Sequence, residues 1–267
     1  MTVAFNYLGK MGQLGNQMFQ FAATLGVARY TGVTYTIPNH DEVLIDGLGN
    51  RLRIELFDCF DIKPENTGIL KTDYVVQEKG FDFDDSVLSS SRQVDYTLYG
   101  YFQTEKYFKH CARELREHFT FKNYIIDECK EIVDECFDEP IALHVRRGDY
   151  LINSGNHYNQ SLDYYEEALK KFDPRTPVVV FSDSIDWCKE QEIFAPDRFS
   201  FSESTETHVD GALVPFVDLC LMTLCDGGIT ANSSLSWWGG FLQKDRTETL
   251  VSPQNWFGPA YASHDTS

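Results

Sequence analysis

The residues His144-Val-Arg-Arg-Gly-Asp-Tyr150 directly follow the apolar run Ile141-Ala-Leu143. A short apolar run that ends in charged residues and a glycine predicts a strand whose last side chains reach a loop. Side chains alternate along a strand, so we expect His144 and Arg146 to share one face and Arg147 to lie on the other. A guanidinium at the carboxyl end of a strand suits a diphosphate, because its planar fork of donors matches two phosphate oxygens. The competing interpretation is a pair of arginines in surface salt bridges.

Strand and helix patterns alternate on both sides of this stretch. The chain opens with a predicted strand at residues 2–8, a glycine turn, a helix at 16–30 and a strand at 33–37, which together form a βαβ unit. Further strands are predicted at residues 73–77, 95–100, 141–147, 177–182, 198–201, 228–231 and 249–252. Further helices are predicted at residues 105–119, 125–137, 162–172, 184–192, 213–225 and 234–243. This order predicts an α/β fold with parallel sheets in two Rossmann-like lobes, residues 1–138 and 139–267.

The composition is that of an acidic globular protein. The chain has 267 residues, with 41 acidic and 23 basic side chains and a formal net charge of -18. That charge argues against nucleic acids and anionic membranes as general partners. The sequence shows neither a basic leader followed by an apolar run nor an apolar stretch of about 18 residues, so we expect a cytoplasmic protein. The seven cysteines are odd in number and form no C-x-x-C pair, which favours reduced thiols.

Metal binding is not predicted. The histidines show neither an H-E-x-x-H motif nor a His/Cys spacing that suits zinc. Asp82-Phe-Asp84 has a D-x-D form that can hold a divalent metal on a nucleotide-sugar diphosphate, but it is far in sequence from the arginines. Because a site with its own arginine needs a metal less, we predict no metal and no cofactor.

A glycine turn at residues 9–15 is a candidate phosphate contact, because backbone N–H groups at a helix start can hold an anion. Its spacing is G-x-x-G-x-x-G, so it matches neither the dinucleotide fingerprint nor the P-loop. The remaining signal is Gly15 followed by Asn16, whose amide has donors and acceptors for a ligand. Simple capping of the helix by Asn16 explains the same residues equally well.

Two further strand ends carry polar groups. Asp183 follows an apolar strand, where its carboxylate can accept from a sugar hydroxyl or a base amide, or can merely cap the next helix. Asn232, Ser233 and Ser234 connect a strand to a helix, and their hydroxyls with exposed helix N–H groups suit an anion. The adjacent pair of tryptophans, at positions 237 and 238, is interpreted as core packing.

Four blocks taken together carry a resemblance. They are Gly12-Gln-Leu-Gly-Asn-Gln-Met-Phe-Gln-Phe-Ala22, His144-Val-Arg-Arg-Gly-Asp-Tyr150, Phe181-Ser-Asp183 and Asn232-Ser-Ser-Leu-Ser-Trp-Trp-Gly239. In this order they resemble the α-1,2-fucosyltransferases of glycosyltransferase family 11, particularly the bacterial members. The resemblance implies a GT-B architecture, two Rossmann-like lobes around a central cleft, with GDP-fucose held by the carboxyl-terminal lobe and the acceptor by the amino-terminal lobe.

The resemblance also implies an activity. It is the inverting, metal-independent transfer of L-fucose from GDP-β-L-fucose to the 2-hydroxyl of a galactoside, in the synthesis of a glycan or surface polysaccharide. The implied partners are GDP-fucose and a galactose-terminated acceptor, and a lipid-linked acceptor would bring the protein to a membrane surface.

The arginine block receives its roles from the same resemblance. Arg146 would grip the β-phosphate and stabilise the departing GDP by electrostatic catalysis. Arg147 would anchor the loop or assist, and His144 would contact the nucleotide.

The other blocks would complete the donor site. Gly15 and Asn16 would close on the phosphates from the other lobe, and Ser233 and Ser234 would complete the diphosphate pocket. Asp183 would serve the guanosine.

The catalytic base is the least determined part of the site. No glutamate lies between Asp149 and Asp163, so Asp149 is the nearest acid, although it also fits as the ion-pair partner of an arginine. His157 is another candidate because it is near the motif. A transition state that relies on the leaving group needs little help from a base.

Three other functions remain open on the sequence. A transferase for another GDP-sugar is the nearest, because arginines and serines bind phosphates and do not read the sugar. A non-catalytic carbohydrate-binding protein leaves the arginine block unexplained, and a nucleotide-dependent oxidoreductase conflicts with the glycine spacing.

Overall fold

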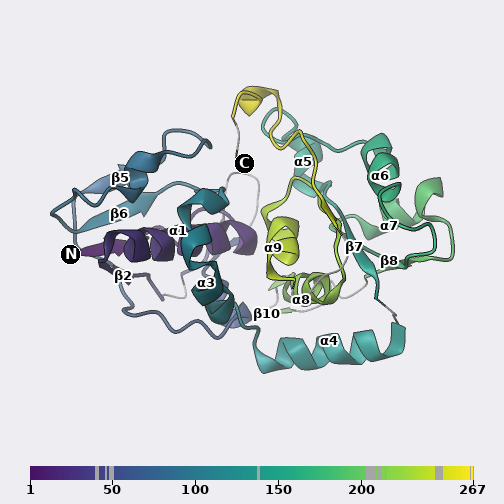
Figure 1. The fold of residues 1–267 in the computed structure, drawn as a ribbon, viewed down its shortest axis with the longest axis horizontal. Coiled ribbons are helices and arrows are strands. Elements are labelled where there is room, and N and C mark those ends of the chain that lie inside the picture. Colours follow the sequence, from purple (N-terminus) through teal and green to yellow (C-terminus); the bar gives the residue numbers. More distant parts are fainter. Residues whose placement is uncertain are drawn as a thin grey trace. The chain divides into compact units, whose positions relative to one another are not determined.

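The computed structural model describes residues 1–39, 42–45, 47, 51–136, 139–202, 208–209, 212–213, 215–243, 249–264 and 266. The chain divides into two compact units. The N-terminal unit comprises Met1–Lys122 together with Ser263–Ser267, and the C-terminal unit comprises Asn123–Ala262 (Figure 1).

The N-terminal unit is built on a parallel sheet of four strands, in the order β2-β1-β6-β5. These strands are β1 (Thr2–Ala4), β2 (Thr34–Thr36), β5 (Val75–Gln77) and β6 (Tyr96–Tyr99). Helix α1 (Leu14–Thr31) connects β1 to β2, so the predicted βαβ opening is confirmed. The helix is buried along most of its length and ends at Gly32, whose left-handed φ of 72° closes the last turn.

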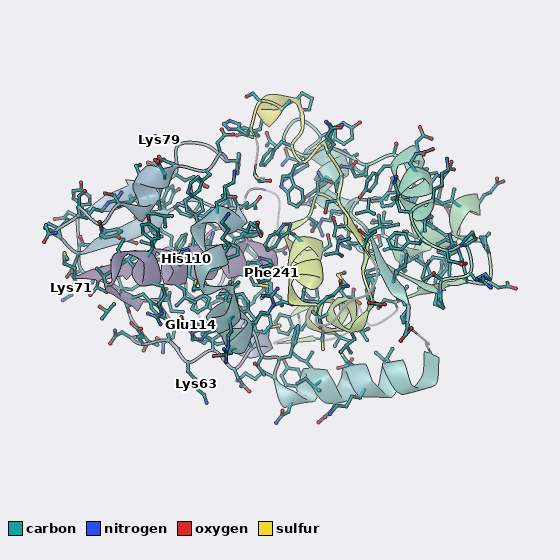
Figure 2. All side chains as sticks on the ribbon, in the orientation of Figure 1. Lys63, Lys71, Lys79, His110, Glu114 and Phe241 are labelled. Carbon is teal, nitrogen blue, oxygen red and sulfur yellow. The ribbon has the colours of Figure 1, made fainter. Side chains whose placement is uncertain are left out.

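Around this sheet lie shorter elements, β3 (Leu44–Ile45), β4 (Arg51–Leu52), α2 (Leu56–Cys59), η1 (Asp85–Leu88), η2 (Glu105–Tyr107), η3 (Lys109–Cys111) and α3 (Ala112–His118). The helix predicted at residues 105–119 is therefore two 3-10 turns followed by α3. Its first part lies against α1 so closely that a Cβ on Gly26 would overlap the Tyr107 backbone. On α3, Glu114, labelled in Figure 2, accepts a 2.8 Å hydrogen bond from Arg29 of α1.

The C-terminal unit contains a parallel sheet of five strands, in the order β13-β12-β7-β8-β9. These strands are β7 (Ile141–Val145), β8 (Val178–Ser182), β9 (Phe199–Phe201), β12 (Gly228–Ile229) and β13 (Leu250–Val251). Ile141, Leu143 and Val145 join one core cluster with buried residues of α6 (Leu162–Leu169) and α7 (Ile185–Lys189).

The remaining elements of this unit are α4 (Asn123–Cys136), α5 (Gly148–Ile152), η4 (Glu192–Phe194), β10 (His208–Val209), β11 (Ala212–Leu213), α8 (Phe216–Leu224), α9 (Ser234–Leu242) and η5 (Pro259–Tyr261). The α/β class and the parallel sheets of both lobes agree with the sequence prediction. None of the helices in the described ranges combines the length and the apolar character that crossing a membrane requires.

The boundary between the units differs from the predicted one at residue 138. Helix α4 belongs to the C-terminal unit because it packs on α8, where the Cys129 thiol lies 3.7 Å from the Val217 carbonyl oxygen. At the other end of the chain, Ser263–Ser267 belong to the N-terminal unit, and His264 hydrogen-bonds Asp82 there at 2.7 Å. The sequence does not reveal the unit to which α4 or residues 263–267 belong, because their packing partners lie far along the chain.

Candidate active site at the arginine loop

Strand β7 ends at Val145, so both arginines lie in the short connection to α5. This connection is at the carboxyl end of a central strand, which is where α/β sheets gather ligands. Helix α5 was missed by the sequence analysis, since five residues, Gly148–Ile152, are too few for a periodic signal.

His144 is buried, whereas the side chain of Arg146 is partly exposed. His144 is 5% exposed and lines a cavity of about 10 Å³ together with Ser236, Gly240 and Gln243 from α9 and the residue after it. Burial, followed by the charge of Arg146, lowers the pKa of His144 to about 3, so the ring is neutral. His144 therefore has the surroundings of a core residue, and its predicted contact with the nucleotide stays a prediction.

Arg146 is held between two carboxylates. One terminal nitrogen lies 2.6 Å from Oδ1 of Asp149, and the other lies 3.1 Å from Oδ2 of Asp183. Its guanidinium carbon is 5.4 Å from the centre of the Tyr150 ring. Burial lowers the pKa of Arg146, but the charges of Asp183 and Asp149 outweigh it and raise the pKa overall. The structure thus presents a fixed cation that is 24% exposed.

Asp183 organises the loop around this cation. Besides its ion pair with Arg146, its Oδ1 accepts a 2.9 Å hydrogen bond from the backbone N–H of Arg147. A Cβ on Gly148 would overlap the same carboxylate, and the φ of Gly148 is not left-handed. The glycine therefore provides space for the Asp183 carboxylate. The contact that was predicted between Asp183 and guanosine stays a prediction.

Arg147 is stacked on Trp187. Its guanidinium carbon lies 3.7 Å from the centre of that ring, a cation–π geometry that fits the predicted anchoring role. Trp187 follows β8 on α7 and packs partly on the core cluster, so the sequence gave no sign that it would touch the loop.

Tyr150 connects the arginine loop to the strand end at Asn232. Its hydroxyl donates a 2.9 Å hydrogen bond to the Asn232 carbonyl oxygen. The Asn232 amide donates to the carbonyls of Tyr158 and Trp256 at 2.9 and 2.7 Å, and its Oδ1 accepts from Gln160 at 3.2 Å. Asn232, predicted to bind substrate, is thus occupied in holding three backbone segments together.

The amino terminus of α9 begins beside Asn232. Ser233 is the N-cap residue and is 7% exposed, yet its side chain makes no capping hydrogen bond. Ser234 is the first helical residue. Helix N–H groups and free hydroxyls suit an anion, as predicted for these residues. Trp238 is fully buried, which confirms its interpretation as core packing, whereas Trp237 is partly exposed and stacks on Phe241, labelled in Figure 2.

The glycine turn of the N-terminal unit precedes α1. The helix begins at Leu14 with Gln13 as its N-cap residue, so Asn16 lies in the first turn and is not the cap. Its Oδ1 accepts a 2.7 Å hydrogen bond from Gln103. Gly12, with a φ of 74°, lies so close to Asn16 that a Cβ there would overlap its amide. Gly15 is buried in the first turn.

Two buried glutamines that the sequence analysis did not single out hold this turn. The Gln17 amide donates to the Arg53 carbonyl at 2.6 Å and accepts from the Glu55 N–H at 2.8 Å. The Gln20 amide donates to the Met11 carbonyl at 3.0 Å. Both residues lie within the first quoted family block, so that block encodes a structural brace as well as the ligand contact predicted for Gly15 and Asn16.

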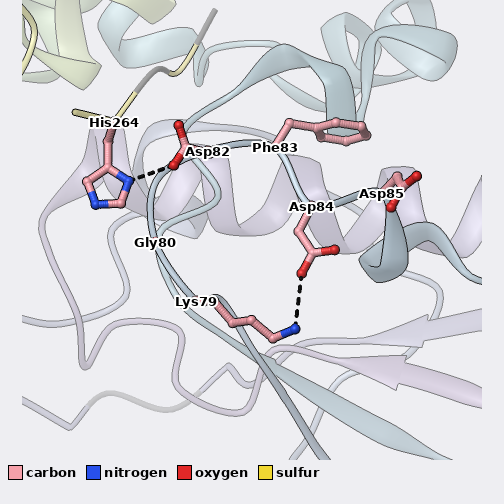
Figure 3. Close-up of a pocket in the computed structure, with 7 residues that line it drawn as sticks. All are labelled: Lys79, Gly80, Asp82, Phe83, Asp84, Asp85 and His264. Carbon is pink, nitrogen blue, oxygen red and sulfur yellow. Dashed lines mark hydrogen bonds and ion pairs between the residues drawn. The ribbon is translucent and has the colours of Figure 1, made fainter.

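The D-x-D element lies in a separate pocket of the N-terminal unit, with a volume of about 520 Å³ (Figure 3). Asp82 pairs with His264, whereas Asp84 accepts a 2.9 Å hydrogen bond from the Ser86 N–H and lies 3.8 Å from Lys79. The two carboxylates thus engage different partners. Within the described residues, His, Cys, Asp and Glu side chains do not gather in any group of three that could hold a metal ion.

Comparison with known proteins identifies the family. The family model for glycosyl transferase family 11 matches residues 4–265. An α-1,2-colitosyltransferase from Escherichia coli is 28% identical over 92% of this chain and 90% of its own length. The human galactoside α-(1,2)-fucosyltransferase 1 is 23% identical over 90% of this chain and 66% of its own length.

Solved structures share the fold. The fucosyltransferase NodZ from Bradyrhizobium superposes with a TM-score of 0.56 at 15% identity, over 91% of this chain and 93% of that one. A crystal of NodZ soaked with GDP-fucose gives the same TM-score, 0.56, at 16% identity. At this identity the likeness shows a common architecture of two Rossmann-like lobes, the GT-B class. Taken with the match along nearly the whole sequence, the arginine loop and the two parallel sheets are those of a member of glycosyltransferase family 11, and the chain belongs to that family.

Proposed function

We propose that this family 11 glycosyltransferase transfers L-fucose from GDP-β-L-fucose to the 2-hydroxyl of a galactoside, with inversion and without a metal. The proposal rests on the position of Arg146, a cation that Asp149 and Asp183 hold at the carboxyl end of β7. Support comes from the human relative, named for galactoside α-(1,2)-fucosyl transfer, and from NodZ, a fucosyltransferase that was soaked with GDP-fucose.

The donor diphosphate would bind at the arginine loop and the amino terminus of α9. Arg146 supplies the positive charge, and the hydroxyls of Ser233 and Ser234 with the first N–H groups of α9 supply neutral donors. Arg147, held flat on Trp187, keeps the loop in place and adds a second cation. For Gly15 and Asn16 the predicted contact with the phosphates stays a prediction.

The chemical step needs charge stabilisation on the leaving group. The bond between C1 of fucose and the β-phosphate oxygen breaks, and its electron pair leaves with GDP. The acceptor oxygen forms a bond to C1 from the opposite face, which inverts the configuration. Arg146 stabilises the negative charge that grows on the phosphate, and such preorganised groups usually supply the largest part of catalysis. Asp149 assists by orienting Arg146, since it is engaged in that ion pair.

A second candidate function differs from the first in the sugar that is transferred. The Escherichia coli relative that is 28% identical is named an α-1,2-colitosyltransferase, so a colitose donor is the alternative. Both sugars would arrive on the same kind of diphosphate, and the arginine loop would not distinguish them. A lipid-linked acceptor, and with it association with a membrane surface, is compatible with either donor.

Calorimetric titration of GDP, GDP-fucose, GDP-mannose and UDP in EDTA tests the donor. We expect micromolar binding of GDP and GDP-fucose only, and loss of that binding with loss of transfer in Arg146→Ala. Arg175→Ala is the matched control, because the Arg175 side chain is 90% exposed and pairs with Asp173 in a surface loop. Absence of GDP binding by the wild type, or full turnover by a folded Arg146→Ala, would contradict the proposal.

Metal independence is tested in the same preparation. Transfer of fucose to a galactoside acceptor should proceed in EDTA, because Arg146 occupies the role that a cation has in metal-dependent transferases. Complete loss that manganese restores would instead direct attention to Asp82 and Asp84.

A further inference from the structure

His157 lies against the arginine loop in a fixed position. Its ring stacks on Tyr150 with 4.0 Å between ring centres and an angle of 8° between the planes. Its backbone is held by an antiparallel bridge to Phe257 and by a 3.1 Å hydrogen bond from its N–H to the Asn153 carbonyl. The Tyr150 ring that supports His157 also lies 5.4 Å from the Arg146 guanidinium carbon. The Tyr150 ring therefore contacts both the imidazole of His157 and the guanidinium that is proposed to hold the leaving group.

The carboxylates near Arg146 are engaged. Asp149 and Asp183 both form ion pairs with it, so their carboxylate oxygens already face the guanidinium. The Tyr150 hydroxyl donates to the Asn232 carbonyl, and burial raises the pKa of Tyr150 to about 12. His144 is only 5% exposed and faces α9.

His157 has the two properties that the other groups lack. It is partly exposed, and within the described part of the chain neither of its ring nitrogens forms a hydrogen bond to protein. Burial lowers the pKa of His157, Asp149 opposes this by raising it, and Arg146 lowers it further, so the net pKa lies below the usual 6.5. The ring is therefore neutral at pH 7 and available to accept a proton.

We propose that His157 is the general base that removes the proton from the acceptor hydroxyl, an inference that rests on the proposed transfer reaction. The proton moves from the acceptor oxygen to the imidazole as that oxygen forms its bond to C1. The bond from C1 to the phosphate oxygen breaks, and its electron pair stays with GDP. The imidazolium then returns the proton to solvent.

Substitutions of His157 test whether its ring acts as a base or only packs on Tyr150. His157→Phe preserves a flat ring on Tyr150 without nitrogens, and His157→Gln removes the titrating group while keeping a polar side chain. We expect turnover to fall by about 10²–10⁴-fold in both variants, which is the usual contribution of a general base. Affinity for GDP, measured by calorimetry, should stay at the wild-type value and show that the variants are folded.

The pH profile gives a second readout. Wild-type turnover should fall tenfold for each unit of pH below the pKa of His157, and the residual activity of His157→Phe should lack this acid limb. Wild-type turnover in His157→Phe, or an acid limb that persists in both variants, would overturn the proposal. If the wild type itself transfers no fucose, the proposed function is wrong as well. If the wild type and both variants transfer fucose equally well, only the role of His157 as general base is wrong.

Discussion

The loop after β1 and the loop after β7 have the same place in their sheets, between a parallel strand and a helix, yet different interactions hold them. In the C-terminal unit the loop is held by charge, since Arg146 pairs with Asp149 and Asp183. In the N-terminal unit the glycine turn is held by the uncharged amides of Gln17 and Gln20.

This difference bears on which loop binds an anion more strongly. The arginine loop presents a guanidinium that stays charged at any ordinary pH. At the amino terminus of α1 the N–H of Leu14 already bonds the buried carboxyl of Glu55, and Lys10 of the preceding turn is paired with Glu42 at 3.1 Å. Similar topology thus provides a loop built around an arginine in one unit and a loop held by glutamine amides in the other. We therefore expect substitutions around Arg146 to affect donor binding and turnover more than substitutions around Asn16.

Among the substitutions around the two loops, Asp183→Ala should lower turnover the most, because Asp183 contacts both Arg146 and the Arg147 backbone. In Asp183→Ala the Arg147 N–H loses its acceptor and Arg146 loses one of its two carboxylates. A displacement of Arg146 by about 1 Å would lower turnover by roughly 10²-fold. Asp183→Asn keeps an acceptor for the N–H and should lose less. Steady-state kinetics with GDP-fucose checks both variants.

Gln103→Ala is the matched change at the other loop, since Gln103 donates to Asn16. Its turnover should remain within a few-fold of wild type. Equal losses at Asp183 and Gln103 would show that the two loops matter alike and would remove the distinction.

Substitution of Gly148 should lower the stability of the protein. In Gly148→Ala the new Cβ overlaps the Asp183 carboxylate, so the loop must shift, and such overpacking costs about 1–3 kcal/mol of stability. Gly155→Ala is the control, because a Cβ there has nothing within 4 Å and its φ is also not left-handed. Thermal denaturation of the two variants should show a lower midpoint for Gly148→Ala only. Equal midpoints would mean that the space beside Asp183 is not needed.

Much of the fold was readable from the sequence because its signals are local. The apolar run before His144 predicted β7, and the glycine turn before Asn16 predicted the strand, turn and helix that opens the chain. Boundaries shifted where tertiary contacts decided them, as at residues 105–119, where close packing on α1 breaks the helix.

The sequence predicted several residues of the candidate site but not the contacts between them. The motif identified Arg146 and Arg147, yet their partners Asp183 and Trp187 are more than thirty residues away, and only the fold brings them together. The three side-chain hydrogen bonds of Asn232 could not be predicted, because they reach segments whose positions no local pattern gives, and its contact with the substrate stays a prediction.

The stability of the two units should also depend differently on pH. Burial raises the pKa of Glu55 and of Glu78, both in the N-terminal unit, to about 7, whereas in the C-terminal unit burial lowers the pKa of His144 to about 3. A carboxyl whose folded pKa is raised contributes stability below its unfolded pKa and loses it as pH rises toward 7. A buried neutral histidine contributes stability above 6.5 and loses it as pH falls toward 3.

Between pH 6.5 and 5 the two units should therefore respond in opposite directions. The loss at His144 over this interval is on the order of 2 kcal/mol, since one pKa unit corresponds to about 1.4 kcal/mol. Hydrogen exchange, corrected for the intrinsic rate at each pH, should show weaker protection of β7 and stronger protection of α1 at pH 5. Glu55→Gln should reduce the response of α1 and leave β7 unchanged, and His144→Gln should do the reverse. If protection of β7 and α1 changes together in every variant, general surface charge governs the response, and these buried groups do not distinguish the two units.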